Sequence, residues 1–235
     1  MIDARILPLQ RAALAPIARW LAHRGVRADS LSLAGFACGL LAVAALALGV
    51  WGIALLLIAL NRLCDGLDGA VARLGTPTDR GAFLDISLDF VFYALVPLGF
   101  ALHDPVQNAL PAAILIAAFV GTGSSFLAFA TIAAKQGRAT PDYPTKGIYY
   151  LGGLTEGFET IVIFAAMCLW PAAFPALAVI FSLACAVTTL LRWHQGWRAF
   201  SAAAPHDPAP YDTAPHDTAP QDTAPQDPVR YDPRP

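Results

Sequence analysis

Apolar runs of about 20 residues fill most of this sequence between residues 30 and 195, and a helical run of that length crosses a bilayer. Backbone groups that are exposed to lipid must be hydrogen-bonded within their own segment, which favours helices over irregular structure. The composition agrees, since 57% of the 235 residues are hydrophobic and 14% are charged. The sequence therefore predicts an all-α, polytopic membrane protein.

Six membrane-spanning helices are expected, because six apolar segments are separated by charges or helix breakers. Their approximate ranges are 31–50, 52–73, 82–102, 109–134, 147–169 and 172–195. Lysine and arginine occur before the first segment and after the second, fourth and sixth, whereas the other three loops carry neither. By the positive-inside rule, both termini are predicted to be cytoplasmic.

The two ends of the chain differ from this membrane domain, which is expected to cover residues 30–200. Residues 1–29 place apolar side chains at helical spacing between arginines, which predicts an interfacial amphipathic helix on the cytoplasmic surface. A loosely ordered basic arm is the alternative. Residues 201–235 repeat a unit of Ala, Pro, a variable residue, Asp and Thr. This tail has almost no aliphatic bulk, so we expect it to be disordered, acidic and cytoplasmic.

Four aspartates lie where the second and third predicted spans meet, and charge is costly to place in a membrane. Asp65 and Asp68 are three residues apart, and Asp85 and Asp89 are four apart. In helices each pair would therefore project from one face. The segment between the pairs contains the helix breakers Gly75, Pro77 and Gly81. The sequence therefore predicts a helical hairpin in which the two pairs face each other.

Carboxylates packed this closely repel one another, and protonation or bound cations relieve the repulsion. Oxygen ligands without His or Cys suit a hard cation, Mg²⁺ or Mn²⁺, better than zinc. The four cysteines fall in apolar segments without paired spacing, so neither a disulfide framework nor a zinc site is indicated.

The spacing of the carboxylates and their neighbours is Asp65-x2-Asp68-Gly69-x2-Ala72-Arg73-x7-Gly81-x3-Asp85-x3-Asp89. Together with the hydropathy of residues 30–195, it resembles the CDP-alcohol phosphatidyltransferase family. The resemblance implies an enzyme of phospholipid biosynthesis that transfers a phosphatidyl group from CDP-diacylglycerol to a small alcohol and releases CMP. It also implies two Mg²⁺ or Mn²⁺ ions and a location in the bacterial inner membrane. The implied partners are membrane lipid and a second copy of the chain in a homodimer, with no nucleic acid.

The same resemblance assigns roles to individual residues. The implied metal ligands are Asp65, Asp68, Asp85 and Asp89. Asp89 would also be the base that accepts the proton of the acceptor hydroxyl. The residues expected to contact the nucleotide and its diphosphate are Gly66, Gly69, Ala72, Arg73 and Gly81. The alternative is that the small residues serve close helix packing and that Arg73 offsets the helix dipole.

A second set of polar residues is expected at similar depth, and it consists of Arg62, Ser124, Glu156 and Glu159. Buried ions usually pair or line a wet cavity, so Arg62 is predicted to pair with Glu156 or Glu159. The functional alternative is that all four residues form an acceptor pocket beside Asp89.

Two other functions stay open at this point. The first is transfer of a phosphoalcohol from a CDP-alcohol to a lipid hydroxyl, which would use the same metal chemistry. The second is a divalent-cation or proton-coupled carrier, which would also need intramembrane carboxylates. Inverted repeats would favour a carrier, and the sequence shows no convincing repeat. The sequence does not identify the acceptor alcohol.

Overall fold

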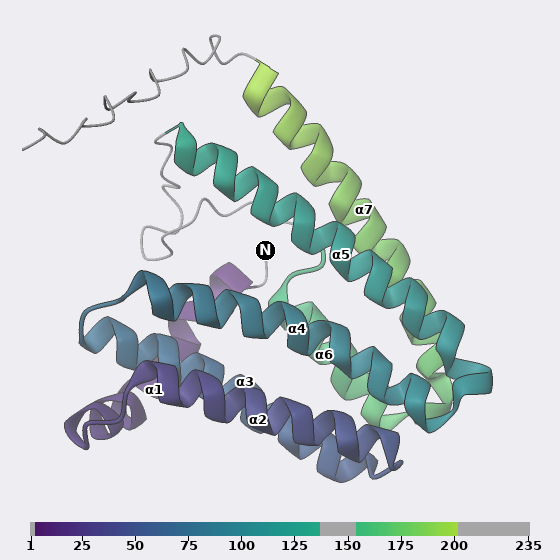
Figure 1. The fold of residues 1–235 in the computed structure, drawn as a ribbon, viewed down its shortest axis with the longest axis horizontal. Helices are drawn as coiled ribbons and strands as arrows, with labels where there is room; N and C mark the ends of the chain where they lie inside the picture. The colour runs from purple at the N-terminus through teal and green to yellow at the C-terminus, as the bar shows by residue number, and fades with distance from the viewer. Residues whose placement is uncertain (1–2, 137–153, 202–235) are drawn as a thin grey trace, which may run out of the picture.

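The computed structural model describes residues 3–136 and 154–201, and every regular element in these two ranges is helical (Figure 1). The elements are α1 (Asp3–His23), α2 (Ala28–Ala47), α3 (Trp51–Leu74), α4 (Asp79–His103), α5 (Pro105–Lys135), α6 (Gly157–Leu169), the 3-10 turn η1 (Pro171–Ala173) and α7 (Phe174–Ser201). The all-α prediction is confirmed for these ranges. Apart from Ser201, the tail that was predicted to be disordered lies outside them.

Four of the described helices are long and apolar enough to cross a membrane. They are Ala28–Ala47, Asp79–His103, Pro105–Lys135 and the segment Pro171–Ser201. Two predicted spans are not among them. The 24-residue helix α3 is long enough but carries Arg62, Asp65 and Asp68. Helix α6 has 13 residues, and residues 147–153 of the predicted span 147–169 lie outside the described ranges. The prediction of six spans is therefore supported for four.

Helix α2 packs against both α3 and α4, and α5 runs along α7 (Figure 1). Glycines allow the close approach of α2. A Cβ atom at Gly35 would lie 2.8 Å from Cβ of Cys64 on α3, and one at Gly39 would lie 2.7 Å from Cδ2 of Phe92 on α4. Small residues at such contacts are typical of helix packing in membranes, where close van der Waals contact drives association.

Aromatic side chains join α4 to the second half of the chain. Phe92 meets Phe164 of α6 edge-on with 6.3 Å between ring centroids, and Phe100 stacks on Phe174 of α7 at 4.4 Å. All four rings are almost completely buried. Such ring pairs add to the stabilisation that burial of their area provides. They fix α4, which carries two of the aspartates, against α6 and α7.

Helix α1 is continuous through Pro8 and Pro16. Its Leu14 and Ala18 are buried against the α3 residues Leu67 and Val71. Trp20 lies on the exposed side of the helix and is 55% exposed. The face that carries Leu14 and Ala18 is therefore packed on α3. The interfacial amphipathic character of this helix and its position on the membrane surface remain predictions.

The predicted hairpin between the aspartate pairs is confirmed. Helix α3 ends at Leu74, and α4 begins at Asp79 after four connecting residues that include Gly75 and Pro77. The hydroxyl of Thr78 caps α4 by accepting a hydrogen bond from the backbone N–H of Gly81 at 3.1 Å. Gly81 thus lies in the first turn of α4.

Replacing Gly39 with Ala tests the close packing of α2 on α4. The added methyl group would overlap the buried Phe92 ring, so Gly39→Ala should lower the free energy of unfolding by about 1–3 kcal/mol. Thermal unfolding in detergent, followed by circular dichroism, measures the change. The matched control is Gly52→Ala, because a Cβ atom at Gly52 meets nothing within 4 Å and should cause no loss. Equal unfolding temperatures for the two variants would contradict this packing.

Candidate functional site

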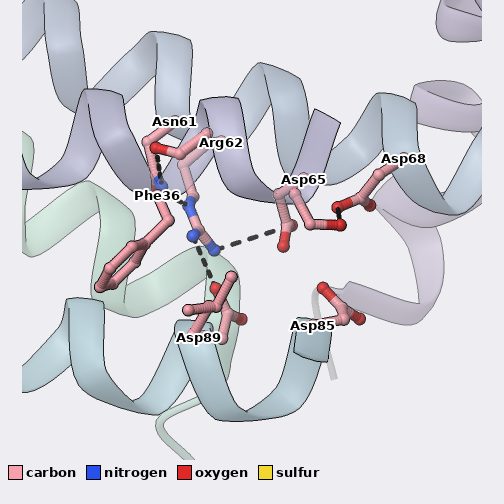
Figure 2. Close-up of a pocket in the computed structure, with 10 residues that line it drawn as sticks. Phe36, Asn61, Arg62, Asp65, Asp68, Asp85 and Asp89 are labelled. Carbon is pink, nitrogen blue, oxygen red and sulfur yellow. Dashed lines mark hydrogen bonds and ion pairs between the residues drawn. The ribbon is translucent and has the colours of Figure 1, made fainter. Parts of the chain in front are cut away.

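A pocket between α3 and α4, closed on one side by α2, contains all four aspartates that were predicted to face each other (Figure 2). Its lining residues are Ser32, Gly35 and Phe36 of α2, Asn61, Arg62, Asp65 and Asp68 of α3, and Asp85, Leu88 and Asp89 of α4. The spacing of three and four residues places each pair on one helix face. The hairpin then brings the two faces together, as the sequence predicts.

Arg62 lies between two of these carboxylates and links α3 to α4 (Figure 2). Its Nη2 donates a hydrogen bond to Oδ1 of Asp89 at 2.6 Å, and its Nη1 lies 3.6 Å from Oδ2 of Asp65. Asp65 follows Arg62 by three residues on the same helix, so the two side chains share a face. The side chain of Arg62 is 17% exposed, compared with 36% for Asp65 and 30% for Asp89. The fixed positive charge offsets part of the repulsion between the carboxylates.

Two further groups hold the guanidinium of Arg62 in place. Its Nε donates to Oδ1 of Asn61 at 2.7 Å, and Asn61 in turn donates to the backbone carbonyl of Gly35 on α2 at 2.8 Å. Its Nη1 donates to the hydroxyl of Tyr93 at 3.3 Å, and its Cζ lies 4.8 Å from the ring centroid of Phe92. The position of this charge is therefore set by α2, α3 and α4 together.

Ser32 on α2 contacts a third carboxylate. Its hydroxyl donates to Oδ2 of Asp68 at 2.5 Å, and Asp68 is 5% exposed. A hydrogen bond to a carboxylate is charge-assisted and strengthens as water is excluded. Sequence reasoning missed this contact because Ser32 is 36 residues away on another helix, where spacing along the chain does not show what it faces.

The predicted ion pair between Arg62 and Glu156 or Glu159 is wrong. Arg62 pairs with Asp89 and Asp65, while the two glutamates form a capping box at the start of α6. In that box the backbone N–H of Glu156 donates to Oε2 of Glu159 at 3.2 Å. Helical spacing indicates the face from which Arg62 projects. It does not show which acidic residue lies across from that face.

The four residues expected to form an acceptor pocket are not brought together around the aspartates. Arg62 lines the pocket, but Ser124, Glu156 and Glu159 are not among the described residues that do. The hydroxyl of Ser124 donates to the carbonyl of Gly121 in its own helix at 3.3 Å. The acceptor role of these three residues therefore stays a prediction.

The residues predicted to contact the nucleotide are not among the described residues that line the pocket. A Cβ atom at Gly66 would lie 2.7 Å from Leu14 and 2.9 Å from Gln10, so this glycine lets α1 approach α3. A Cβ atom at Gly69 would lie 3.2 Å from Nη1 of Arg73, whose side chain folds back along the helix. The structure thus supports the packing alternative for Gly66. The nucleotide contacts of Gly69, Ala72, Arg73 and Gly81 remain predictions.

Arg192 on α7 is a buried arginine whose contacts were not predicted from the sequence. Arg192 is 8% exposed, and its Nη1 donates to the carbonyl of Thr122 on α5 at 3.0 Å. Its Cζ lies 5.6 Å from the ring of Phe126. Thr188 and Thr189, four and three residues earlier, share its helix face, and this polar stripe was the available signal.

The donor set of the pocket fits a hard divalent cation, because four carboxylates line it together and no His or Cys does. Within residues 3–136 and 154–201, however, no three Asp, Glu, His or Cys side chains converge closely enough to enclose an ion. Arg62 holds Asp89 and Asp65, and Ser32 holds Asp68. The chemistry of the donor set therefore fits Mg²⁺ or Mn²⁺.

Comparison with known proteins agrees with this site. A family model described as CDP-alcohol phosphatidyltransferase matches residues 26–191, which include the whole aspartate hairpin. The chain is 53% identical to inner membrane protein YnjF of Escherichia coli (strain K12) over 197 residues, covering 84% of this chain and 96% of that protein. It is 27% identical to the archaetidylinositol phosphate synthase of Pyrococcus horikoshii, over 69% of this chain and 80% of that enzyme.

Two crystal structures of the phosphatidylinositol phosphate synthase of Mycobacterium tuberculosis share the fold with a TM-score of 0.62 each. One has CDP-DAG bound, is 23% identical, and is matched over 78% of this chain and 93% of its own. The other is in complex with manganese and citrate, is 24% identical, and is matched over 78% and 88%. Since the family model covers more than half of the sequence, the chain belongs to the CDP-alcohol phosphatidyltransferases, a family of membrane transferases in phospholipid biosynthesis.

Proposed function

We propose that the protein transfers the phosphatidyl group of CDP-diacylglycerol to a small alcohol and releases CMP. The observation that carries the proposal is the pocket in which Asp65 and Asp68 of α3 face Asp85 and Asp89 of α4. The family match includes this hairpin, and a protein with the same fold binds CDP-DAG. The alternative is transfer of a phosphoalcohol from a CDP-alcohol to a lipid hydroxyl. It would use the same pocket, but the acceptor rather than the CDP compound would carry the lipid.

The reaction breaks the bond between the lipid phosphorus and the CMP oxygen and forms a bond from the same phosphorus to the acceptor oxygen. When bound, two Mg²⁺ or Mn²⁺ ions would supply the positive charge that neutralises the diphosphate and the departing CMP. Asp65, Asp68 and Asp85 would hold these ions, and a structure of the same fold contains manganese. Ser32 would keep the Asp68 carboxylate oriented toward its ion.

Asp89 would accept the proton of the acceptor hydroxyl. It lies one turn beyond Asp85 on α4, and its Oδ1 is the oxygen that Arg62 engages. Oδ2 is then the oxygen that would take the proton. A base must lie within hydrogen-bond reach of the proton that it removes, so the hydroxyl would bind beside Asp89 in this pocket.

In the membrane, we expect α3 and the segment around α6 to complete six spans with both termini in the cytoplasm. Helix α3 has 24 residues, enough to cross, and Arg62, Asp65 and Asp68 face the pocket rather than lipid. Helix α1 would lie on the cytoplasmic surface.

The relative named as an inner membrane protein supports a bacterial inner-membrane location. We also expect a homodimer. A carrier function is not retained, because the chain belongs to a transferase family.

Release of CMP by purified protein in detergent tests the proposal. The assay contains CDP-diacylglycerol, Mn²⁺ or Mg²⁺, and a panel of free and phosphorylated small alcohols. One acceptor should give metal-dependent CMP release, and Asp89→Asn should lower the rate at least about 100-fold because the base is lost. The matched control is Asp79→Asn, since Asp79 is exposed and lies outside the pocket. A folded Asp89→Asn variant with wild-type turnover would rule out this role for Asp89.

The Ser32 hydroxyl gives a second prediction. Without it, Asp68 loses its orienting hydrogen bond, so Ser32→Ala should raise the Mn²⁺ concentration needed for half-maximal CMP release about tenfold. Titration of Mn²⁺ in the same assay measures the shift. Ser30→Ala serves as the control, because Ser30 is on the same helix but is exposed and outside the pocket. An unchanged Mn²⁺ requirement in Ser32→Ala would show that Ser32 does not support a metal ligand.

A further inference from the structure

We infer that Arg62 is a positioning residue that holds Asp89 for proton transfer and acts as a tethered cation on the Asp65–Asp89 side of the pocket. As a consequence, a divalent cation binds more weakly there than beside Asp68 and Asp85, neither of which forms an ion pair with Arg62. This inference rests on the proposed function, because it assigns unequal affinities to the two cations of that reaction.

Arg62 is held in the pocket by groups other than the carboxylates as well. Its Nε is bonded to Asn61, which is 4% exposed and is fixed in turn by the backbone carbonyl of Gly35. Its Nη1 donates to the Tyr93 hydroxyl, and its plane lies near the Phe92 ring. Leaving this position would break these hydrogen bonds inside an apolar protein, where unpaired donors are costly. Arg62 therefore stays in the pocket when a metal arrives.

Positive charge is distributed unequally among the four carboxylates of the pocket. Asp89 and Asp65 each lie within ion-pair distance of the Arg62 guanidinium, at 2.6 and 3.6 Å. Asp68 is bonded instead to the uncharged hydroxyl of Ser32. The Arg62 guanidinium repels a second cation that binds a few ångströms away, and solvent screens this repulsion only in part at carboxylates that are 30–36% exposed. The side that contains Arg62 therefore has the lower affinity for Mg²⁺ or Mn²⁺.

The Arg62 guanidinium also fixes the orientation of the Asp89 carboxylate. The bond from Nη2 to Oδ1 of Asp89 is short and charge-assisted, so it fixes the rotamer of that carboxylate. The planar guanidinium bonds Asn61, Tyr93 and Asp89 at the same time. A lysine ammonium is a single point charge and cannot form these three hydrogen bonds in the same geometry. Arg62→Lys thus retains the charge but loses the geometry, and Arg62→Gln loses both.

Mn²⁺ binding to the purified protein, followed by electron paramagnetic resonance without any CDP lipid, tests the charge argument. The wild type should show a stronger and a weaker site, and Arg62→Gln should bind at the weaker site about tenfold more tightly. Arg62→Lys should keep the wild-type affinities. Arg80→Gln is the matched control, because Arg80 is an arginine with an 80% exposed side chain outside the pocket, and its loss should change neither site.

Turnover separates positioning from a merely structural role. In the CMP-release assay, both Arg62→Gln and Arg62→Lys should have kcat values at least about tenfold below wild type, since neither fixes Asp89. Tighter Mn²⁺ binding combined with slower turnover is the expected signature of Arg62→Gln. A residue that only stabilises the fold would lower the unfolding temperature without tightening Mn²⁺ binding.

Three results would overturn the inference. Folded Arg62→Gln protein that binds Mn²⁺ with wild-type or weaker affinity would exclude the tethered-cation role. Wild-type kcat in Arg62→Lys would exclude the positioning role, and this variant tests that role even if Arg62→Gln does not fold. Folded wild-type protein that binds no Mn²⁺ would remove the metal site of the proposed function and the inference with it. When the wild type binds Mn²⁺, failure at Arg62 leaves the proposed function standing.

Discussion

Repulsion among four carboxylates in one pocket of an apolar helical protein is the constraint on which the rest of this structure depends. Burial costs each charge its hydration, and the fold compensates with groups from neighbouring helices. Arg62 contacts Asp65 and Asp89, and the Ser32 hydroxyl donates to Asp68. These contacts require α2, α3 and α4 at close range, which the glycines of α2 allow. Close packing of these three helices is therefore a condition for the contacts that stabilise the carboxylates.

The features that follow from spacing within one helix could be predicted from the sequence. Three- and four-residue separations place the aspartates on helix faces, and Gly75 and Pro77 mark the turn, so the hairpin was correctly predicted. Six spans were predicted and four are supported, because α6 has 13 residues and α3 carries the charges of Arg62, Asp65 and Asp68. Those charges face a protein pocket rather than lipid, and only the packed structure shows that difference.

Contacts between helices that are distant in sequence could not be read in this way. The partner of Arg62 was predicted wrongly, since Asp89 lies across the pocket while Glu156 and Glu159 cap α6. Gly66 shows the same limit, because a small residue fits both a bound nucleotide and a neighbouring helix, and here α1 lies against it. Ser32 and Arg192 stand in apolar helices, where the sequence does not show what they touch.

The most direct test of this account is a product balance in liposomes that contain the protein, CDP-diacylglycerol, Mn²⁺ and the active alcohol. CMP and lipid products would be quantified together by mass spectrometry. Transfer through the aspartate pocket predicts one new phospholipid carrying the alcohol for each CMP released, and neither product after chelation of the metal. CMP formed with phosphatidic acid but without the new phospholipid would contradict the account, because the pocket would then catalyse hydrolysis rather than transfer.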